Sequence, residues 1–363
     1  MTVIPQLPDG LTPLYVTQLL HADGCLPANG AVESVRLELV GDGTGMSSEI
    51  ARLFLEYDGS YGAVPQTLIA KFLPRNEINR NSAIAFNLPE REVRYARELD
   101  PVTDAVSPRT YACLLEPEQF LLLMEDLGDY RVGSQYAGAT LEETELALGE
   151  LAKLHSAFWN RVDAIDWVPG IANSYHADAL HNGAKSIGWD NMIANFDVPA
   201  YVQRHRDAFL AAIPALQAQR MAPPLTLVHG DFRMENVMFG EQPDQHRIVV
   251  FDWQGPLKAR GMFDVSLFLS QSTRTEVRRA HEKALLEGYL DGLQAGGVDD
   301  VSMAFLWDDY LRCTLYNWVY TAVVAGTLDT SNVTAHRWMT KMIERHAAAS
   351  EDHDVFQYLP EPA

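Results

Sequence analysis

The chain has 363 residues, of which 47% are hydrophobic and 21% charged, a composition typical of folded globular proteins rather than disordered ones. Its formal net charge of −21 disfavours nucleic acid as a partner, because an acidic surface repels phosphate backbones. No apolar run is long enough for a membrane span, and the N-terminus MTVIPQLPDG lacks the pattern of a secretory signal, so we expect no membrane association and a cytoplasmic protein.

Solvated acidic helices explain most of the negative charge, and a weaker alternative is that the charge favours a cationic substrate. The three cysteines, Cys25, Cys113 and Cys313, are far apart and show neither CxxC nor Cys/His ligand spacing. We therefore expect reduced, buried thiols and no metal site built on cysteine.

The first third of the chain predicts a small domain with a sheet. An amphipathic stretch, LTPLYVTQLL, and a turn rich in Gly, Pro and Asn predict a helical extension over residues 1–30. Alternating apolar residues on both sides of GDGTGMSSE predict two strands joined by a glycine loop, over 32–39 and 50–57. A third strand is predicted at TLIAKF, a helix at LPEREVRYARELD with Pro89 in its first turn, and a buried strand at FLLLMEDL.

After Gly128 the pattern becomes helical. Four apolar residues recur on one face of the stretch 141–159, namely Ala147, Leu151, Leu154 and Phe158. Further helices are predicted near 198–219, 275–294 and 301–325, with a short β-rich stretch at 225–251. The order predicts an α+β chain with two domains, residues 1–127 and residues 128–363.

The segment HGDFRMEN, residues 229–236, contains the chemistry-bearing residues with the most specific spacing. Asp231 is suited to accept a hydroxyl proton, and Asn236 offers a neutral oxygen to a hard cation such as Mg²⁺. Asp252 ends the apolar run IVVFD, where a carboxylate at a strand end is placed to bind metal. Each residue alone could be an ordinary turn residue, but the combination predicts phosphoryl transfer.

HGDFRMEN resembles the catalytic loop of the aminoglycoside phosphotransferase and choline kinase superfamily, and FDWQ resembles its metal-binding segment. LAKLHSAFW, EREVRYARELD and LLLMEDL are similar to motifs of the ecdysteroid-kinase-like (CHK kinase-like) branch. The resemblance covers about residues 10–325. It implies a two-lobed, protein-kinase-like α+β fold, in which a small N-terminal lobe has an antiparallel sheet and a larger C-terminal lobe is mostly helical. It also implies ATP and Mg²⁺ as cofactors and an acceptor held by the helical lobe.

The resemblance implies phosphate contacts for the glycine loop. Its backbone amides at Gly41, Gly43 and Gly45 would approach phosphate, and the hydroxyls of Ser47 and Ser48 would add donors. A Gly-rich hairpin alone could equally be a plain turn. It is not a Walker A motif, because no Gly-Lys-Ser/Thr follows.

Lys71 is the only lysine in an otherwise apolar strand, so it lies at a sheet edge or has polar partners. The resemblance makes it the ligand of the α- and β-phosphates. Its expected partner is Glu92, Glu90 or Glu98 on the following helix, with Glu92 matching the superfamily best. Backbone groups of Glu125 and Leu127 would bond adenine at the end of LLLMEDL.

Three further polar residues are given structural roles. We expect His229 to fix the backbone of its loop rather than act in catalysis, and Asp264 to brace that loop. His155, on the apolar face of its helix, is expected to be a satisfied core histidine. The aromatic stretch 307–320 should be mostly core, although some rings could line an acceptor pocket.

Together these features predict an enzyme, an ATP- and Mg²⁺-dependent kinase in which Asp231 is the catalytic base, Asn236 and Asp252 hold the metal, and the acceptor is a hydroxyl-bearing small molecule. The alternative is a nucleotide-binding regulator without turnover. An amino alcohol, an antibiotic, a steroid-like alcohol and a hydroxyacyl thioester all remain open as acceptors. No Ala-Pro-Glu segment follows Asp252, which argues against protein substrates. We expect a monomer or a weak homodimer.

Overall fold

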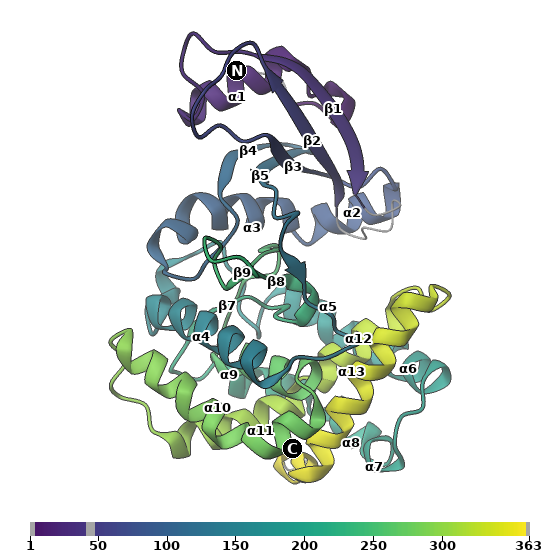
Figure 1. Ribbon diagram of the computed structural model, residues 1–363. Helices are drawn as coiled ribbons and strands as arrows, with labels where there is room; N and C mark the ends of the chain where they lie inside the picture. Colours follow the sequence, from purple (N-terminus) through teal and green to yellow (C-terminus); the bar gives the residue numbers. More distant parts are fainter. Residues whose placement is uncertain (1–3, 41–47, 361–363) are drawn as a thin grey trace. The chain divides into compact units, whose positions relative to one another are not determined.

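The structure, a computed structural model, describes residues 4–40 and 48–360. Its contacts divide these residues into two compact units (Figure 1). Unit 1 contains the described residues up to Val102, then Ser107–Asp129 and Phe251–Gly255. Unit 2 contains Thr103–Val106, Tyr130–Val250 and the described residues from Pro256 onward. The sequence-based boundary between residues 127 and 128 stays a prediction.

Unit 1 is built on one antiparallel sheet with strand order β1-β2-β3-β5-β4. The strands are β1 (Val32–Val40), β2 (Glu49–Tyr57), β3 (Thr67–Phe72), β4 (Thr110–Glu116) and β5 (Gln119–Glu125). The four predicted strands are confirmed as β1, β2, β3 and β5. Strand β4 has no counterpart in the sequence-based assignment, since TYACLLE lacks a clear alternation and all but one of its residues are half-buried.

Both faces of this sheet are covered, and the residues of β5 alternate between them. Leu121 and Leu123 pack on the side of helix α1 (Pro13–Asp23), whereas Phe120 and Leu122 pack on the side of helices α2 (Glu77–Ala85) and α3 (Leu88–Arg94). Lys71 of β3 pairs in register with Leu122, so the lysine is on the α3 side of the sheet.

The helix predicted at residues 88–100 is confirmed in α3, with Pro89 in its first turn. Its second half, Tyr95–Leu99, is a π-helical turn rather than a continuous α-helix. The predicted N-terminal helix is α1, which inserts Val16 and Leu20 into the core under the sheet.

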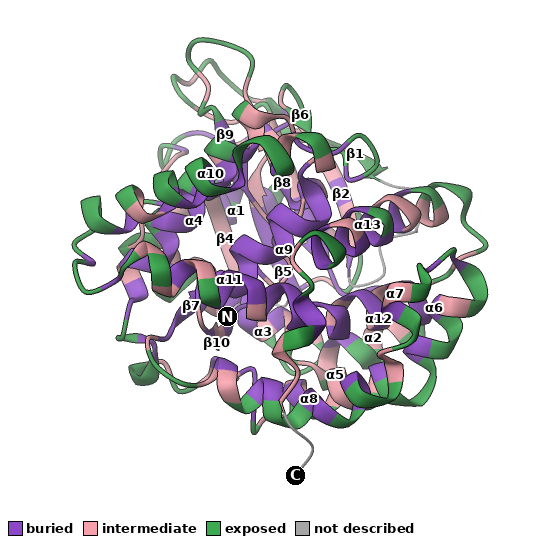
Figure 2. Cartoon of the chain, turned by 90° about the horizontal axis from the view of Figure 1, so that it is seen from below, coloured by how far each residue is buried: buried purple, intermediate pink, exposed green. Residues whose placement is uncertain are grey.

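Unit 2 is mostly helical. Its helices are α4 (Leu141–Phe158), α5 (Tyr175–Gly183), α6 (Trp189–Asn195), α7 (Ala200–Gln203), α8 (Arg206–Arg220), α9 (Met262–Leu267), α10 (Thr275–Ala295), α11 (Met303–Tyr316), α12 (Trp318–Thr327) and α13 (Val333–Asp352). Helices α4 and α10 confirm two predictions, and the four apolar residues predicted on one face of α4 are all buried. Figure 2 shows the alternation of buried and exposed residues along α10.

Two predicted helices of unit 2 are each broken in two. The stretch 198–219 forms α7 and α8, and the stretch 301–325 forms α11 and α12 with a break at Asn317. Helices α5, α6, α9 and α13 were not predicted. Within a large buried core, Trp189 packs against Trp318, with ring centroids 6.1 Å apart. No helix in residues 4–40 and 48–360 is long and apolar enough to cross a membrane.

Short strands connect the helices of unit 2 and carry its loops. They are β6 (Arg131–Val132), β7 (Thr226–Val228), β8 (Val237–Phe239), β9 (Ile248–Val250) and β10 (Leu257–Ala259). They form a three-stranded sheet, β6-β8-β9, and a two-stranded sheet, β10-β7. The predicted α+β class, with an antiparallel sheet in the N-terminal part and a mostly helical C-terminal part, is confirmed.

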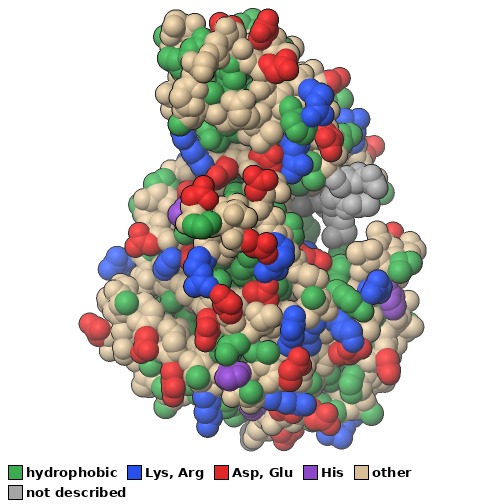
Figure 3. All heavy atoms as spheres, viewed as in Figure 1, with side chains coloured by type: hydrophobic (Ala, Val, Ile, Leu, Met, Phe, Trp, Pro, Cys, Tyr) green, Lys and Arg blue, Asp and Glu red, His purple; other side chains and the backbone are tan. Residues whose placement is uncertain are grey.

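On the face shown in Figure 3, acidic and basic side chains are interspersed. Among the described residues, charged side chains form ion pairs such as Arg131 with Glu143 at 2.8 Å and with Glu241 at 2.9 Å. Exposed pairs of this kind contribute little to stability, on the order of 0–1 kcal/mol each.

Candidate active site

The segment HGDFRMEN lies in unit 2 between β7 and β8, and a buried carboxylate holds its backbone in place. Asp264, in α9, accepts hydrogen bonds from the backbone N–H of His229 at 2.6 Å and of Gly230 at 3.1 Å. Gly230 adopts a φ of +85°, a conformation that favours glycine and that turns the chain toward Asp231. Asp264 is fully buried, so these two bonds are shielded from water. The expected bracing contact by Asp264 is therefore present.

Two histidines belong to the support of this loop. His229 is fully buried, and its Nδ1 accepts a hydrogen bond from the backbone N–H of Asp231 at 3.3 Å. His155 of α4 is also fully buried, with Nδ1 2.8 Å from the Tyr289 hydroxyl and Nε2 3.5 Å from the Asp264 carboxylate. Both contacts agree with the structural roles expected for these histidines.

The Asp231 side chain lies at the partly exposed surface of the loop, with about a quarter of its area accessible. Asn236 donates from Nδ2 to the backbone carbonyl of Asp231 at 2.8 Å and to its Oδ2 at 3.1 Å. The two candidate residues are therefore brought together by one short loop. Because both contacts use the N–H groups of the Asn236 amide, neither involves the side-chain oxygen that a cation would need.

Three residues near Asp231 were not identified as site residues from the sequence. The Tyr320 hydroxyl, from α12, donates a hydrogen bond to Asp231 Oδ1. Arg233 Nε lies 3.3 Å from the same oxygen, and its guanidinium stacks over the ring of Trp338 from α13 at 4.8 Å. Arg233 could have been noticed because it belongs to HGDFRMEN. Tyr320 ends the aromatic stretch 307–320, for which an acceptor pocket was left open, whereas no sequence signal linked Trp338 to this loop.

Unit 1 carries a separate cluster of charged residues. Lys71 Nζ lies 2.7 Å from Glu92 Oε1 and 2.7 Å from Asp252 Oδ1. Lys71 and Glu92 are almost fully buried, while the Asp252 side chain is 23% exposed. The sequence left Glu90 and Glu98 open as partners, and the structure instead pairs both with Arg94, on the exposed side of the helix.

The electrostatics of this cluster keep the lysine charged. Burial alone would lower the pKa of Lys71, but the carboxylates of Asp252 and Glu92 raise it above its ordinary value. Burial raises the pKa of Glu92, and the ammonium of Lys71 opposes that change. A protonated lysine held by two carboxylates is a cation that an anionic ligand could engage by replacing one of them.

Asp252 has a strained backbone, with φ at +66°, an uncommon value for a residue other than glycine. Its Oδ2 accepts a hydrogen bond from Gln254 Nε2 at 3.1 Å. The next residue, Trp253, stacks on Tyr95 with ring centroids 3.9 Å apart and planes 6° from parallel. This stack anchors the segment after β9 and fixes the position of the Asp252 carboxylate.

The remaining candidates for nucleotide contacts are only partly covered by the structure. Gly41, Gly43, Gly45 and Ser47 lie outside the described residues, and Ser48 is buried immediately before β2. Glu125 ends β5, where its backbone N–H donates to the carbonyl of Arg109 at 2.8 Å, and Leu127 is buried. The adenine-binding roles of Glu125 and Leu127 stay predictions.

Two of the predicted site residues, each taken by itself, offer oxygen donors that a hard cation accepts. Asn236 of unit 2 has an amide oxygen and Asp252 of unit 1 has a carboxylate. Mg²⁺ is commonly held by one or two such groups together with phosphates and water. In the part of the chain that the structure describes, no cluster of three or more His, Cys, Asp or Glu residues could hold a metal. Either residue alone is an incomplete set of Mg²⁺ ligands, which water and phosphate would complete.

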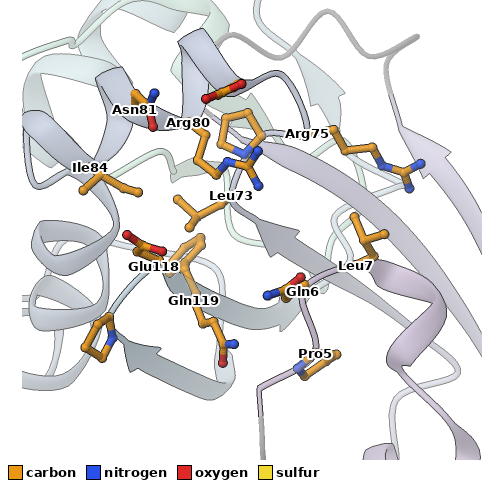
Figure 4. A pocket seen from close by; sticks show the side chains of 14 residues that line it. Pro5, Gln6, Leu7, Leu73, Arg75, Arg80, Asn81, Ile84, Glu118 and Gln119 are labelled. Carbon is orange, nitrogen blue, oxygen red and sulfur yellow. The ribbon is translucent and has the colours of Figure 1, made fainter.

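A cavity of about 570 Å³ in unit 1 contains none of the predicted site residues. Figure 4 shows its lining, which comes from the N-terminal segment, from the link between β3 and α2, from α2 itself, and from the β4–β5 turn with the start of β5. It carries two arginines, Arg75 and Arg80, and two glutamates, Glu77 and Glu118. These opposite charges define no single class of ligand.

Comparison with known proteins places the sequence in a family. A model of the ecdysteroid kinase-like family matches residues 42–297, more than half of the chain. A search of curated proteins gave no match.

Several solved structures are similar to this chain at low sequence identity. Spectinomycin phosphotransferase APH(9)-Ia, solved with ADP and spectinomycin, is 9% identical, with 88% of this chain and 94% of that chain covered and a TM-score of 0.49. A microcompartment-associated aminopropanol kinase is 14% identical, with 95% and 100% covered and a TM-score of 0.45. APH(2″)-IIa, in a ternary complex with streptomycin and ATP, is 13% identical, with 93% and 99% covered and a TM-score of 0.47.

Proposed function

The chain belongs to the ecdysteroid kinase-like family, and on that premise we propose that it is an ATP- and magnesium-dependent kinase that phosphorylates a hydroxyl group of a small molecule. The observation that carries the proposal is the loop of unit 2, where the backbone bonds to Asp264 fix Asp231 and Asn236 side by side. A carboxylate and an amide oxygen on one rigid loop provide a base and a metal ligand, two of the parts that phosphoryl transfer requires.

In this proposal Asp231 orients the acceptor hydroxyl and takes its proton. The acceptor oxygen attacks the γ-phosphorus of ATP, the bond to the bridging oxygen breaks, and ADP leaves with that electron pair. Asn236 and Asp252 would hold Mg²⁺, which supplies charge neutralisation on the phosphates when bound. The Arg233 guanidinium, 3.3 Å from Asp231, would add positive charge near the group being transferred.

Lys71 would hold the α- and β-phosphates of the nucleotide. Its buried pair with Glu92 keeps the ammonium charged and oriented, while its second partner, Asp252, is the more exposed of the two carboxylates. We expect phosphate to replace Asp252 on Lys71, which frees that carboxylate for the metal. The glycine loop would complete the phosphate contacts through Gly41, Gly43, Gly45 and Ser47, together with Ser48.

The test is ATP-dependent phosphorylation of a panel of hydroxyl-bearing small molecules, read by mass spectrometry of the products. Asp231→Asn should reduce transfer by roughly 10²–10⁴-fold, the usual contribution of a positioned general base, while ATP binding stays close to wild type. If the protein binds Mg·ATP but neither transfers nor hydrolyses phosphate, it is a nucleotide-binding regulator and the kinase proposal is wrong.

A further inference from the structure

The Asp231 carboxylate already has three hydrogen-bonding or ionic neighbours. Two come from its own loop, Asn236 at Oδ2 and Arg233 at Oδ1. The third is the Tyr320 hydroxyl, which donates to Oδ1 from a helix 89 residues further along the chain. A carboxylate accepts about four hydrogen bonds in all, so little capacity is left for an incoming hydroxyl while Tyr320 is in place.

The helix that carries Tyr320 is held in place by hydrogen bonds and ring stacking on both sides of this residue in the sequence. Two residues before Tyr320, Trp318 donates from Nε1 to Ser350 Oγ at 2.9 Å and stacks on His346 with ring centroids 4.2 Å apart. One residue after Tyr320, the Thr321 hydroxyl lies 2.8 Å from Nδ1 of the same histidine. Trp318, Val319, Thr321 and Ala322 are all fully buried, whereas Tyr320 is only partly buried. Tyr320 is thus a side chain at the edge of a fixed helix turn, where it can be displaced.

The hydrogen bond from Tyr320 to Asp231 resembles the bond that a substrate hydroxyl would donate to the same carboxylate. A phenol hydroxyl that donates to a carboxylate reproduces the arrangement that a substrate hydroxyl must adopt before it loses its proton. Burial raises the pKa of Tyr320 well above its ordinary value, and the Asp231 carboxylate adds to the shift. The phenol therefore keeps its proton and remains a donor at neutral pH.

We propose that Tyr320 determines which hydroxyls reach the base, because its own hydroxyl occupies the acceptor position on Asp231 Oδ1 and excludes water until an acceptor with further contacts displaces it. This inference rests on the kinase function proposed above. Water has no further contacts with which to displace the tyrosine, whereas a bound small molecule does. Tyr320 is thus a specificity-determining residue that limits wasteful hydrolysis of ATP.

Acceptor-free hydrolysis of Mg·ATP tests this role without knowledge of the acceptor. In that reaction the water oxygen attacks the γ-phosphorus, the bond to the bridging oxygen breaks, ADP leaves with the electron pair, and a water proton passes to Asp231. Tyr320→Phe keeps the ring and removes the hydroxyl. It should raise the hydrolysis rate by roughly tenfold or more, the equivalent of one hydrogen bond to a charged group. A variant that merely damaged the fold would lose activity instead of gaining it.

Tyr316→Phe is the matched control. Tyr316 precedes the break at Asn317 and is fully buried, and its hydroxyl lies 3.4 Å from the amide of Gln217, so it has no part in the contact with Asp231. This variant should hydrolyse ATP at the wild-type rate. Adding Asp231→Asn to Tyr320→Phe should abolish the gain, because the extra hydrolysis depends on the base. If Tyr320→Phe does not fold, Tyr320→Leu carries the same expectation.

The outcomes separate this inference from the kinase proposal. If the wild type binds Mg·ATP and hydrolyses it in an Asp231-dependent way, but Tyr320→Phe leaves the rate unchanged or lower, the role of Tyr320 is refuted and the kinase proposal stands. Phosphate found on Tyr320 by mass spectrometry would also refute it, because the tyrosine would then be an acceptor itself. If the wild type binds no ATP, both proposals are wrong.

Discussion

Lys71→Met removes the cation of the buried cluster formed by Lys71, Glu92 and Asp252, and should lower the free energy of unfolding. The ammonium lies 2.7 Å from each of two carboxylates, and at an effective dielectric constant near 20 each such pair corresponds to about 6 kcal/mol of attraction. Desolvation of the charges offsets much of this, so removing one member of a buried pair typically costs about 3–5 kcal/mol. We expect a folded protein whose free energy of unfolding at pH 7 is lower by that amount.

The loss of stability in Lys71→Met should increase with pH. Burial already raises the pKa of Glu92, and without the opposing ammonium of Lys71 it rises further. An acid whose pKa is raised in the folded state binds more protons folded than unfolded, so its destabilising effect grows as pH increases through that range. The deficit of Lys71→Met should therefore be smaller at pH 5 than at pH 7.

Urea denaturation of four proteins measures these effects: wild type, Lys71→Met, Glu92→Gln and the double variant. Glu92→Gln removes the buried charge, so in the Lys71→Met background it should recover part of the lost stability, with a coupling energy above about 1 kcal/mol. Arg94→Met is a control that disrupts the exposed pairs with Glu90 and Glu98 and should change stability by less than about 1 kcal/mol. A coupling energy near zero, or equal deficits at pH 5 and pH 7, would refute this reasoning.

Other changes test the remaining groups. Asp252→Ala should abolish Mg·ATP-dependent turnover while the circular dichroism spectrum stays native, and near wild-type activity would contradict its metal-binding role. Asp264→Asn replaces one acceptor oxygen by a donor that faces a backbone N–H, so we expect about 1–3 kcal/mol of lost stability and a lower kcat, measured by denaturation and kinetics. Burial lowers the pKa of His346 to about 4 from the ordinary value of 6.5, so stability should fall by up to about 3 kcal/mol as pH drops from 6.5 to 4, and His346→Gln should remove this dependence. A panel of generic proteins should not be labelled by γ-labelled ATP, and labelling stronger than that of small alcohols would contradict the absence of an activation-loop signature.

Local patterns were sufficient for much of unit 1. Two of its five strands follow from alternating apolar residues and two more from short apolar runs, and a lone lysine in TLIAKF predicted either a sheet edge or polar partners, of which the structure shows polar partners. To decide which of the three glutamates on the next helix pairs with Lys71, one must know which face of that helix packs against the sheet. Glu92 faces the sheet and is 4% exposed, whereas Glu90 and Glu98 lie near Arg94, with about 45% of their side chains exposed. Helical spacing groups these residues, but only packing against the sheet decides which one is buried.

Unit 2 was harder to predict because its helices are interrupted at places that no strong breaker marks. The stretch 301–325 reads as one apolar helix, yet it divides at Asn317, whose side chain donates to Ser266 Oγ at 2.8 Å. In a continuous helix Tyr316 and Tyr320 would share a face, since they are four residues apart. The break leaves Tyr316 in the core beside Gln217 and directs Tyr320 to Asp231. The break thus coincides with a tertiary contact that periodicity in the sequence does not reveal.

Helix α9 supports Asp231 from two directions. Its Asp264 holds the backbone ahead of Asp231 through the N–H groups of His229 and Gly230. Its Ser266, two residues later, accepts from Asn317 at the break where α12 begins and from which Tyr320 reaches the carboxylate. Because one buried helix fixes both the loop and the helix that faces it, the spacing between the base and Tyr320 should resist small changes elsewhere in unit 2. We therefore expect an acceptor to displace the tyrosine side chain itself, because both backbone segments that carry the contact are bonded to the same buried helix.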